Sequence, residues 1–161
     1  MRNIVVAQPL PAGAGLRERG KSARRARICA AADRIFRAKG YDQATLREIA
    51  AAAQVGAGTI FSYVRDKREL LMMVVNDELG AVTENAFRGV PRAVPLLEQL
   101  LHVFRPRLIF WARDPDLARH ALHETSGDPH TRETGRFGLG RDRIIEQIAE
   151  LIRPHQAAGT I

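Results

Sequence analysis

The stretch TLREIAAAAQVGAGTIFSYV, residues 45–64, carries two short helical patterns separated by a turn that contains glycine. Thr45 and Glu48 have the spacing of a capping box, in which the threonine oxygen accepts a first-turn N–H and the glutamate reaches back. Apolar residues then recur on one helical face: Leu46, Ile49, Ala50 and Ala53. A second short helix is expected over 57–64. Two short helices joined by a tight turn predict a helix-turn-helix unit.

Gly56 and Gly58 stand where the second short helix begins. Glycine costs about 1 kcal/mol relative to alanine inside a helix, so helix propensity does not explain the pair. A recognition helix places its N-terminal residues against base edges and phosphates. Without Cβ atoms, the backbone N–H groups of the first turn can come close to a phosphate. We interpret both glycines as serving close approach to DNA.

Helical patterns flank the motif on both sides. One begins near Ser22 and ends at Lys39 and Gly40, with a cation in its last turn and a C-terminal glycine. The other is capped by Asp66 and extends to about Asn85. Any small three-helix bundle would share this periodicity, so the pattern alone leaves a purely structural bundle open.

The net charge of +7 is concentrated at the start of the chain. Residues 1–27 hold seven basic residues and one acidic residue, whereas the rest of the chain is almost neutral. We expect residues 1–21 to form a flexible basic arm, with the cations from Arg17 to Arg27 reaching a neighbouring minor groove. A solvated tail that only aids solubility is the alternative.

Neither the composition nor the first residues indicate export or membrane insertion. The single cysteine, Cys29, excludes a disulfide within this chain, and the apolar run after Met1 is too short for a signal peptide or a membrane span. We expect a soluble cytoplasmic protein with no membrane partner.

The run IFRAKGYDQATLREIAAAAQVGAGTIFSYVRDKRELL, residues 35–71, closely resembles the TetR family of bacterial transcriptional regulators. The matching pieces are F-x-x-K-G-Y, T-x-R-x-I-A, V-x-x-G-T-I-F-x-Y and the following Lys67-x-x-Leu70-Leu71, all in register. The resemblance covers roughly residues 22–82. It implies an all-α fold: a three-helix DNA-binding domain over 22–82, with its motif at 45–64, and a helical ligand-binding and dimerisation domain over 83–161. Similar regulators continue for two more helices, so the second domain is expected to be incomplete.

The resemblance also implies a function and a set of contacts. Members are mostly repressors that bind a palindromic operator in double-stranded DNA as homodimers and are released by a small molecule. The positions that match phosphate-contacting residues are Thr45, Ser62, Tyr63 and Lys67. The positions that match the base-facing surface are Arg47, Ala57, Gly58, Thr59 and Phe61. Where members often carry a polar residue and a tyrosine, this chain has Ala57 and Phe61, so we expect readout by Arg47 and by methyl contacts.

After Gly89 the sequence is helical but holds no chemical motif. A helix with Pro106 inside its pattern is expected to kink there, and a kink in a core helix can open a ligand cavity. Candidate ligand-lining residues are Phe104, Phe110, Trp111 and His123. We expect a largely apolar effector.

His120 and His123 give the one lead toward catalysis or metal binding, because two histidines three residues apart share a helix face. The alternative function is therefore a small helical enzyme or metal-binding protein whose N-terminal bundle is only structural. No HExxH pattern, phosphate loop or nucleophile elbow accompanies the pair. We expect no enzymatic activity, no catalytic residue, no metal and no cofactor.

Overall fold

The computed structural model describes residues 15–125 and 132–161, and within them every regular element is an α-helix. The helices in chain order are α1 (Leu16–Lys39), α2 (Leu46–Ala52), α3 (Ala57–Ile60), α4 (Lys67–Arg88), α5 (Leu96–Ala112), α6 (Pro115–Thr125) and α7 (Arg132–Ala157). The expected all-α fold, with N-terminal helix-turn-helix and helical C-terminal part, is confirmed.

Helix α1 begins six residues earlier than the sequence pattern indicates. Its N-cap is Gly15, so residues 16–21, which we expected to be part of a flexible arm, are helical, and Ser22 lies inside the helix rather than capping it. Leu16, Arg17 and Glu18 are good helix formers, and one internal glycine is tolerated at about 1 kcal/mol. The predicted end at Gly40 is confirmed, where φ of +83° requires glycine. The rest of the expected arm, residues 1–14, lies outside the described residues.

The helix-turn-helix has the expected capping box but a shorter second helix. Thr45 accepts from the Glu48 backbone N–H, while Glu48 accepts from the Thr45 backbone. Helix α3 ends at Ile60, not at Val64, and the next residues form a turn. Ser62 explains part of this, because its hydroxyl donates to the Thr59 carbonyl at 2.7 Å and competes with the helical pattern.

The turn between α2 and α3 has a left-handed backbone at Gln54. Neither glycine of the motif adopts that conformation. Its φ is +55°, and among the described residues it is the one non-glycine residue with positive φ. Gly56, by contrast, has an extended backbone with φ of −61°. The sequence pattern gave no sign of this, because glutamine is uncommon in the left-handed region.

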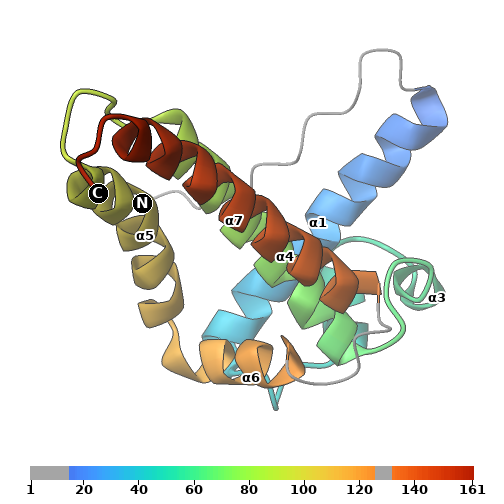
Figure 1. Cartoon of the computed structure of the whole chain (residues 1–161). Coiled ribbons are helices and arrows are strands. Elements are labelled where there is room, and N and C mark those ends of the chain that lie inside the picture. The colour runs from blue at the N-terminus through green and yellow to red at the C-terminus, as the bar shows by residue number, and fades with distance from the viewer. Residues whose placement is uncertain (1–14, 126–131) are drawn as a thin grey trace.

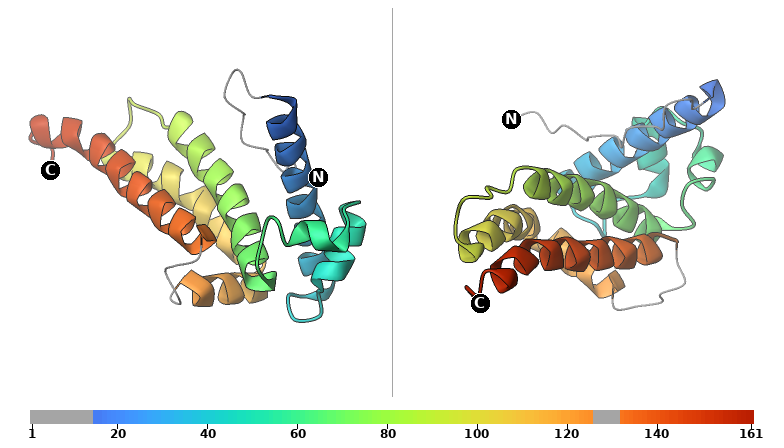
Figure 2. Two further views of the ribbon diagram at one scale, coloured as in Figure 1. Left: turned by 90° about the vertical axis from the view of Figure 1, so that its right-hand side faces the viewer. Right: turned by 45° about the horizontal axis from the view of Figure 1, so that its top comes forward.

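Helix α4 belongs to both halves of the molecule. It packs against α1 on one side and against α5, α6 and α7 on the other, so the domain boundary expected at residue 82 falls inside one continuous helix. Figures 1 and 2 show α4 between α1 and α7, with α3 at the edge of the molecule farthest from α5. The main core also crosses the boundary, since Leu117 and Ala121 of α6 join the buried residues of α1, α2 and α4.

The C-terminal helices leave much apolar surface exposed. A second, smaller core contains Val90, Val103 and Leu151. Leu97, Leu101, Phe104 and Leu108 form a row along α5 with exposed fractions of 67%, 48%, 38% and 67%. Helix α5 continues through Pro106 as one element. No helix in the described ranges combines the length and apolar character needed to cross a membrane.

The left-handed turn predicts an unusual response to glycine. Gln54→Gly should raise the free energy of unfolding by about 0.5–1 kcal/mol, because it relieves the strain of a side chain at positive φ. Urea unfolding followed by circular dichroism measures the change. Gly40→Ala is the opposite control and should lower stability, since its backbone suits glycine alone. A loss of stability in Gln54→Gly would contradict the assignment.

Candidate nucleic-acid interface

Most of the residues expected to face DNA bases are exposed on α2 and α3. Arg47 of α2 is exposed, as are Ala57 and Gly58 of α3 and Phe61, which follows the last residue of α3. Thr59 is half-buried. Phe61 keeps 59% of its surface accessible, which is unusual for a phenylalanine beside a core. This group therefore presents one strong hydrogen-bond donor, Arg47, among small and apolar groups.

Packing within the molecule does not require glycine at the start of α3. A Cβ atom on Gly58 would have no heavy atom within 4 Å, and a Cβ on Gly56 would meet the flexible Thr59 hydroxyl at 3.3 Å. Neither glycine has positive φ. Neither backbone geometry nor internal packing therefore explains why the first turn of α3 contains glycine.

The residues expected to contact phosphates are held by internal hydrogen bonds. The Thr45 hydroxyl donates to Glu48 at 2.8 Å, and the Tyr63 hydroxyl donates to the Lys21 carbonyl of α1 at 3.3 Å. The Ser62 hydroxyl donates to the Thr59 carbonyl. In each of these bonds the hydroxyl donates its proton within the protein, so its oxygen lone pairs remain available.

Lys67 fastens α4 to the loop between α1 and α2. Its ammonium donates to the carbonyls of Tyr41 and Asp42 at 2.9 and 3.0 Å and lies 4.5 Å from the centre of the Tyr41 ring. An ammonium has three N–H donors, so one is left for a phosphate. The sequence did not indicate this structural role, because the resemblance implied only a phosphate contact for Lys67.

Tyr41 is the centre of a small cluster that joins the DNA-binding helices to α6. Its ring lies 4.5 Å from the His120 ring, and the His120 Nε2 atom is 3.9 Å from the Asp42 carboxylate. Burial, followed by the negative charge of Glu124, raises the pKa of Tyr41 to about 12. His120, our lead for catalysis, thus packs between domains, while His123 is exposed. No group of three or more His, Cys, Asp or Glu suited to a metal occurs among the described residues.

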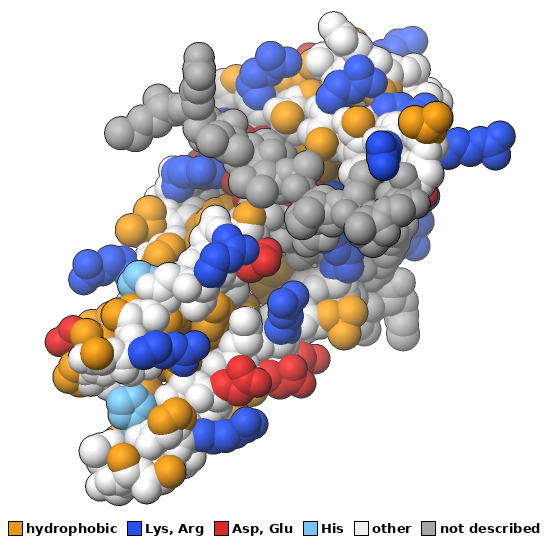
Figure 3. All heavy atoms as spheres, turned by 90° about the horizontal axis from the view of Figure 1, so that it is seen from above, with side chains coloured by type: hydrophobic (Ala, Val, Ile, Leu, Met, Phe, Trp, Pro, Cys, Tyr) orange, Lys and Arg blue, Asp and Glu red, His pale blue; other side chains and the backbone are white. Residues whose placement is uncertain are grey.

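Basic side chains cover the first turns of α1. Arg17, Arg19, Lys21 and Arg24 are exposed, and Figure 3 shows that Lys and Arg side chains are spread over the visible face of the molecule. Arg25 is an exception within the expected arm, because it forms a two-bond ion pair with Asp77 of α4. Its guanidinium is partly buried against α4, so Arg25 has a role within the protein. The expectation that the cations from Arg17 to Arg27 reach a minor groove stays a prediction for the exposed ones.

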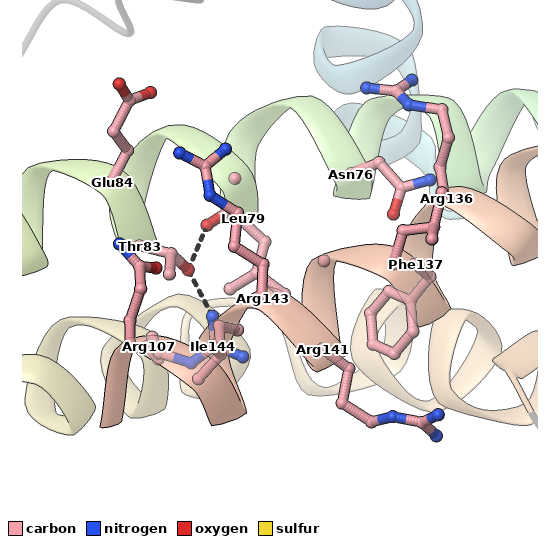
Figure 4. A pocket seen from close by; sticks show the side chains of 14 residues that line it. Asn76, Leu79, Thr83, Glu84, Arg107, Arg136, Phe137, Arg141, Arg143 and Ile144 are labelled. Atoms are coloured by element: carbon pink, nitrogen blue, oxygen red, sulfur yellow. Dashed lines mark hydrogen bonds between the residues drawn. The ribbon is translucent and has the colours of Figure 1, made fainter. Parts of the chain in front are cut away.

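A hollow of about 380 Å³ lies between α4, α5 and α7. Its described lining is mixed, with Leu79, Phe137 and Ile144 beside four arginines (Figure 4). None of the four residues expected to line a ligand site is part of it. Phe110 and Trp111 pack against the main core, and Phe104 and His123 are exposed. Helical periodicity could not indicate which face of α5 meets this hollow.

The exposed helix pair α2 and α3, the open first turn of α3 and the basic start of α1 together form a helix-turn-helix unit with an exposed outer face. Residues 28–73 match the family model described as bacterial regulatory proteins, tetR family. A curated relative, the HTH-type transcriptional regulator HbdR of Aromatoleum sp. (strain CIB), is 30% identical over 79 residues. That match covers 49% of this chain and 34% of the relative, so the chain spans about a third of that protein's length.

Solved structures resemble a larger share of the chain. FadR of Thermus thermophilus, a TetR-family transcriptional repressor in complex with lauroyl-CoA, has a TM-score of 0.60 and 29% identity, covering 85% of this chain and 70% of that one. The fatty acid degradation regulator FadR of Bacillus halodurans has a TM-score of 0.59 over 84% of this chain and 72% of that one, at 21% identity, which supports the fold. Residues 28–73 therefore match the tetR family of bacterial regulatory proteins, and the fold of the described residues is similar to that of a TetR-family repressor.

The capping box predicts a defined loss of stability. Thr45→Ala should lower the free energy of unfolding by about 1 kcal/mol at neutral pH, because the first turn of α2 loses its side-chain acceptor. Thr45→Ser keeps that acceptor and should retain most of the stability. Denaturant unfolding of the three proteins measures the difference, and equal losses in both variants would contradict the capping role.

The same box predicts an acid dependence. Hydrogen bonds from Lys39 and then Thr45 lower the pKa of Glu48 from 4.5 to about 2. Because the folded-state pKa is the lower one, the stabilisation is present above pH 4.5 and is lost as the pH falls toward 2. In Lys39→Ala, which removes the first of these donors, stability should fall less steeply over this range. A slope identical to that of the wild type would contradict the contribution of Glu48.

Proposed function

We propose that this protein is a transcriptional repressor that binds a palindromic operator as a homodimer and leaves it when a small molecule binds the helical C-terminal part. The observation that carries the proposal is that Arg47 of α2 and Gly58 of α3 are both exposed within the family match, with open space beside Gly58. The resemblance to two repressor or regulator structures of the same fold supports it.

Base readout is assigned to Arg47 and to the small residues of α3. An arginine can donate two hydrogen bonds to guanine O6 and N7, which discriminates against other bases by about 1–3 kcal/mol. Ala57, Thr59 and Phe61 offer methyl and ring surface that suits thymine methyl groups. Gly58 lets the backbone of α3 approach the DNA.

Phosphate contacts are assigned to Thr45, Ser62, Tyr63 and Lys67. Their internal hydrogen bonds hold them in place, and contact with phosphate requires each hydroxyl to turn its proton outward. The exposed cations of α1 add sequence-independent affinity, since each neutralised phosphate releases counterions.

Release by a ligand is assigned to the hollow between α4 and α7. Helix α4 lines it with Leu79 and Thr83 and also packs against α1, so a change in α4 reaches the DNA-binding helices. The Thermus thermophilus repressor, solved with lauroyl-CoA, supports a small-molecule effector. We propose a homodimer because a palindromic operator has two equivalent half-sites about 34–36 Å apart, and each copy of the protein reads one of them.

Selection of bound duplexes from a randomised pool at fixed moderate salt tests the proposal. We expect an inverted repeat, and in Arg47→Ala a relaxed preference at one or two positions, because the bidentate donor is gone. Arg119→Ala, which removes an exposed arginine of α6, is the matched control and should select the wild-type repeat. Failure to enrich any sequence, with binding that collapses as salt rises, would contradict operator recognition.

Gly58→Ala separates approach to DNA from stability. The added methyl meets open space inside the protein, so stability should be unchanged or slightly higher, while affinity for the selected operator should fall about tenfold or more through a clash with DNA. Gly80→Ala on α4 also points into open space and should leave DNA affinity unchanged. Titration of a labelled operator measures both. Undiminished affinity in Gly58→Ala would refute the close approach.

A further inference from the structure

The charges around the hollow between α4, α5 and α7 are not balanced. Four arginines line it: Arg107, Arg136, Arg141 and Arg143. Glu84 is the one carboxylate among the described lining residues. It accepts from Arg88 at 3.1 Å, is largely exposed and points away from the other lining side chains in Figure 4. The lining thus carries an excess of positive charge.

Two of the arginines already have carboxylate partners. Arg136 donates to Asp77 at 3.1 Å, and its guanidinium lies at the end of the hollow nearest α1 (Figure 4). Arg141 lies 3.3 Å from the Asp142 carboxylate and extends away from the rest of the lining. Neither guanidinium therefore needs an anion in the hollow.

Arg107 is in a different position. It is half-buried, and burial lowers its pKa. Its guanidinium donates to the Thr83 hydroxyl, whose own proton goes to the Leu79 carbonyl at 2.7 Å. No carboxylate of the described residues forms an ion pair with Arg107 or with Arg143. A guanidinium removed from water without an anionic partner is costly, and a bound oxyanion would offset that cost.

Apolar side chains also line the hollow. Leu79 and Ile144 lie beside Arg107 and Thr83, and the Phe137 ring lies toward the Arg136 end (Figure 4). The volume of about 380 Å³ falls in the range of small-molecule sites, roughly 300–1,000 Å³. A ligand that suits both regions has an oxyanion at one end and a short apolar chain at the other.

We propose that the hollow binds an amphipathic oxyanion, with its charged end held by Arg107 and its apolar end against Leu79, Ile144 and Phe137. The inference rests on the proposed function in one respect, since it names the chemical class of the effector. In this proposal Arg107 makes the site prefer an anionic ligand over a neutral one.

Calorimetric titration of the full chain with octyl phosphate, octanol and inorganic phosphate tests the site. We expect octyl phosphate to bind at one site per chain, and the other two to bind at least about tenfold more weakly, because each lacks one half of the ligand. Arg107→Gln should weaken octyl phosphate about tenfold or more and leave octanol unchanged. Arg107→Lys keeps the charge and should recover part of the affinity.

Arg141→Gln is the matched control, because it makes the same charge change on the same lining with a side chain directed outward. It should bind octyl phosphate as the wild type does. Equal losses in Arg107→Gln and Arg141→Gln would reduce the effect to general electrostatics and overturn the site. Octanol binding as tightly as octyl phosphate would also overturn it. Thermal unfolding of each variant verifies that it is folded, and the lysine variant decides the case if the glutamine variant is not.

The site and the proposed function fail separately. If octyl phosphate binds through Arg107 but no operator is selected from the DNA pool, the ligand site is supported and the proposed regulatory function is refuted. If the protein binds an operator tightly but does not bind octyl phosphate in the calorimeter, the regulatory function is supported and this ligand class is refuted. If both hold, saturating octyl phosphate should weaken operator binding in the wild type, and the same concentration should have a smaller effect in Arg107→Gln.

Discussion

The ion pairs of Asp77 constrain how the two halves of this protein sit together. Its carboxylate, with 9% of the side chain exposed, lies near the middle of α4 and accepts from Arg25 of α1 and Arg136 of α7. A buried carboxylate without partners would cost several kcal/mol, so this position of Asp77 requires both neighbouring helices to be in place. Three helices that are distant from one another in sequence, α1, α4 and α7, therefore meet at one charged group.

The next residue along α4 extends the same arrangement to the other side. Glu78 accepts from Arg113, at the end of α5, and from Arg37 of α1 at 2.6 and 3.3 Å. Arg37 also pairs with Asp33, and its guanidinium lies 3.8 Å from Asp114, the residue that caps α6. The first helix of the DNA-binding domain is thus attached to the helices that surround the hollow by directional charged contacts as well as by the shared core. This arrangement physically connects the helix-turn-helix to the hollow, which the proposed ligand response requires.

Local sequence determined the elements whose causes lie within a few residues. The capping box of Thr45 and Glu48, the Asp66 cap of α4 and the glycine at the end of α1 were all predicted, because each depends on side chains three or four positions apart. The family was predicted for the same reason, since its motifs are contiguous. The start of α1, the end of α3 and the left-handed turn at Gln54 were not, because weak propensities there are decided by competing hydrogen bonds and by packing.

The sequence by itself determined a TetR-type helix-turn-helix and the helical character of the C-terminal half, and it predicted which residues of the motif face DNA. Only the tertiary structure decided which side chains serve the interior: Arg25 turns from the expected arm to Asp77, and Lys67 holds the Tyr41 loop. It also decided that the hollow is lined by arginines of α5 and α7 rather than by Phe104, Phe110, Trp111 and His123. The physical reason is that periodicity defines the face of a helix, whereas the partner of that face depends on contacts between residues far apart in the chain.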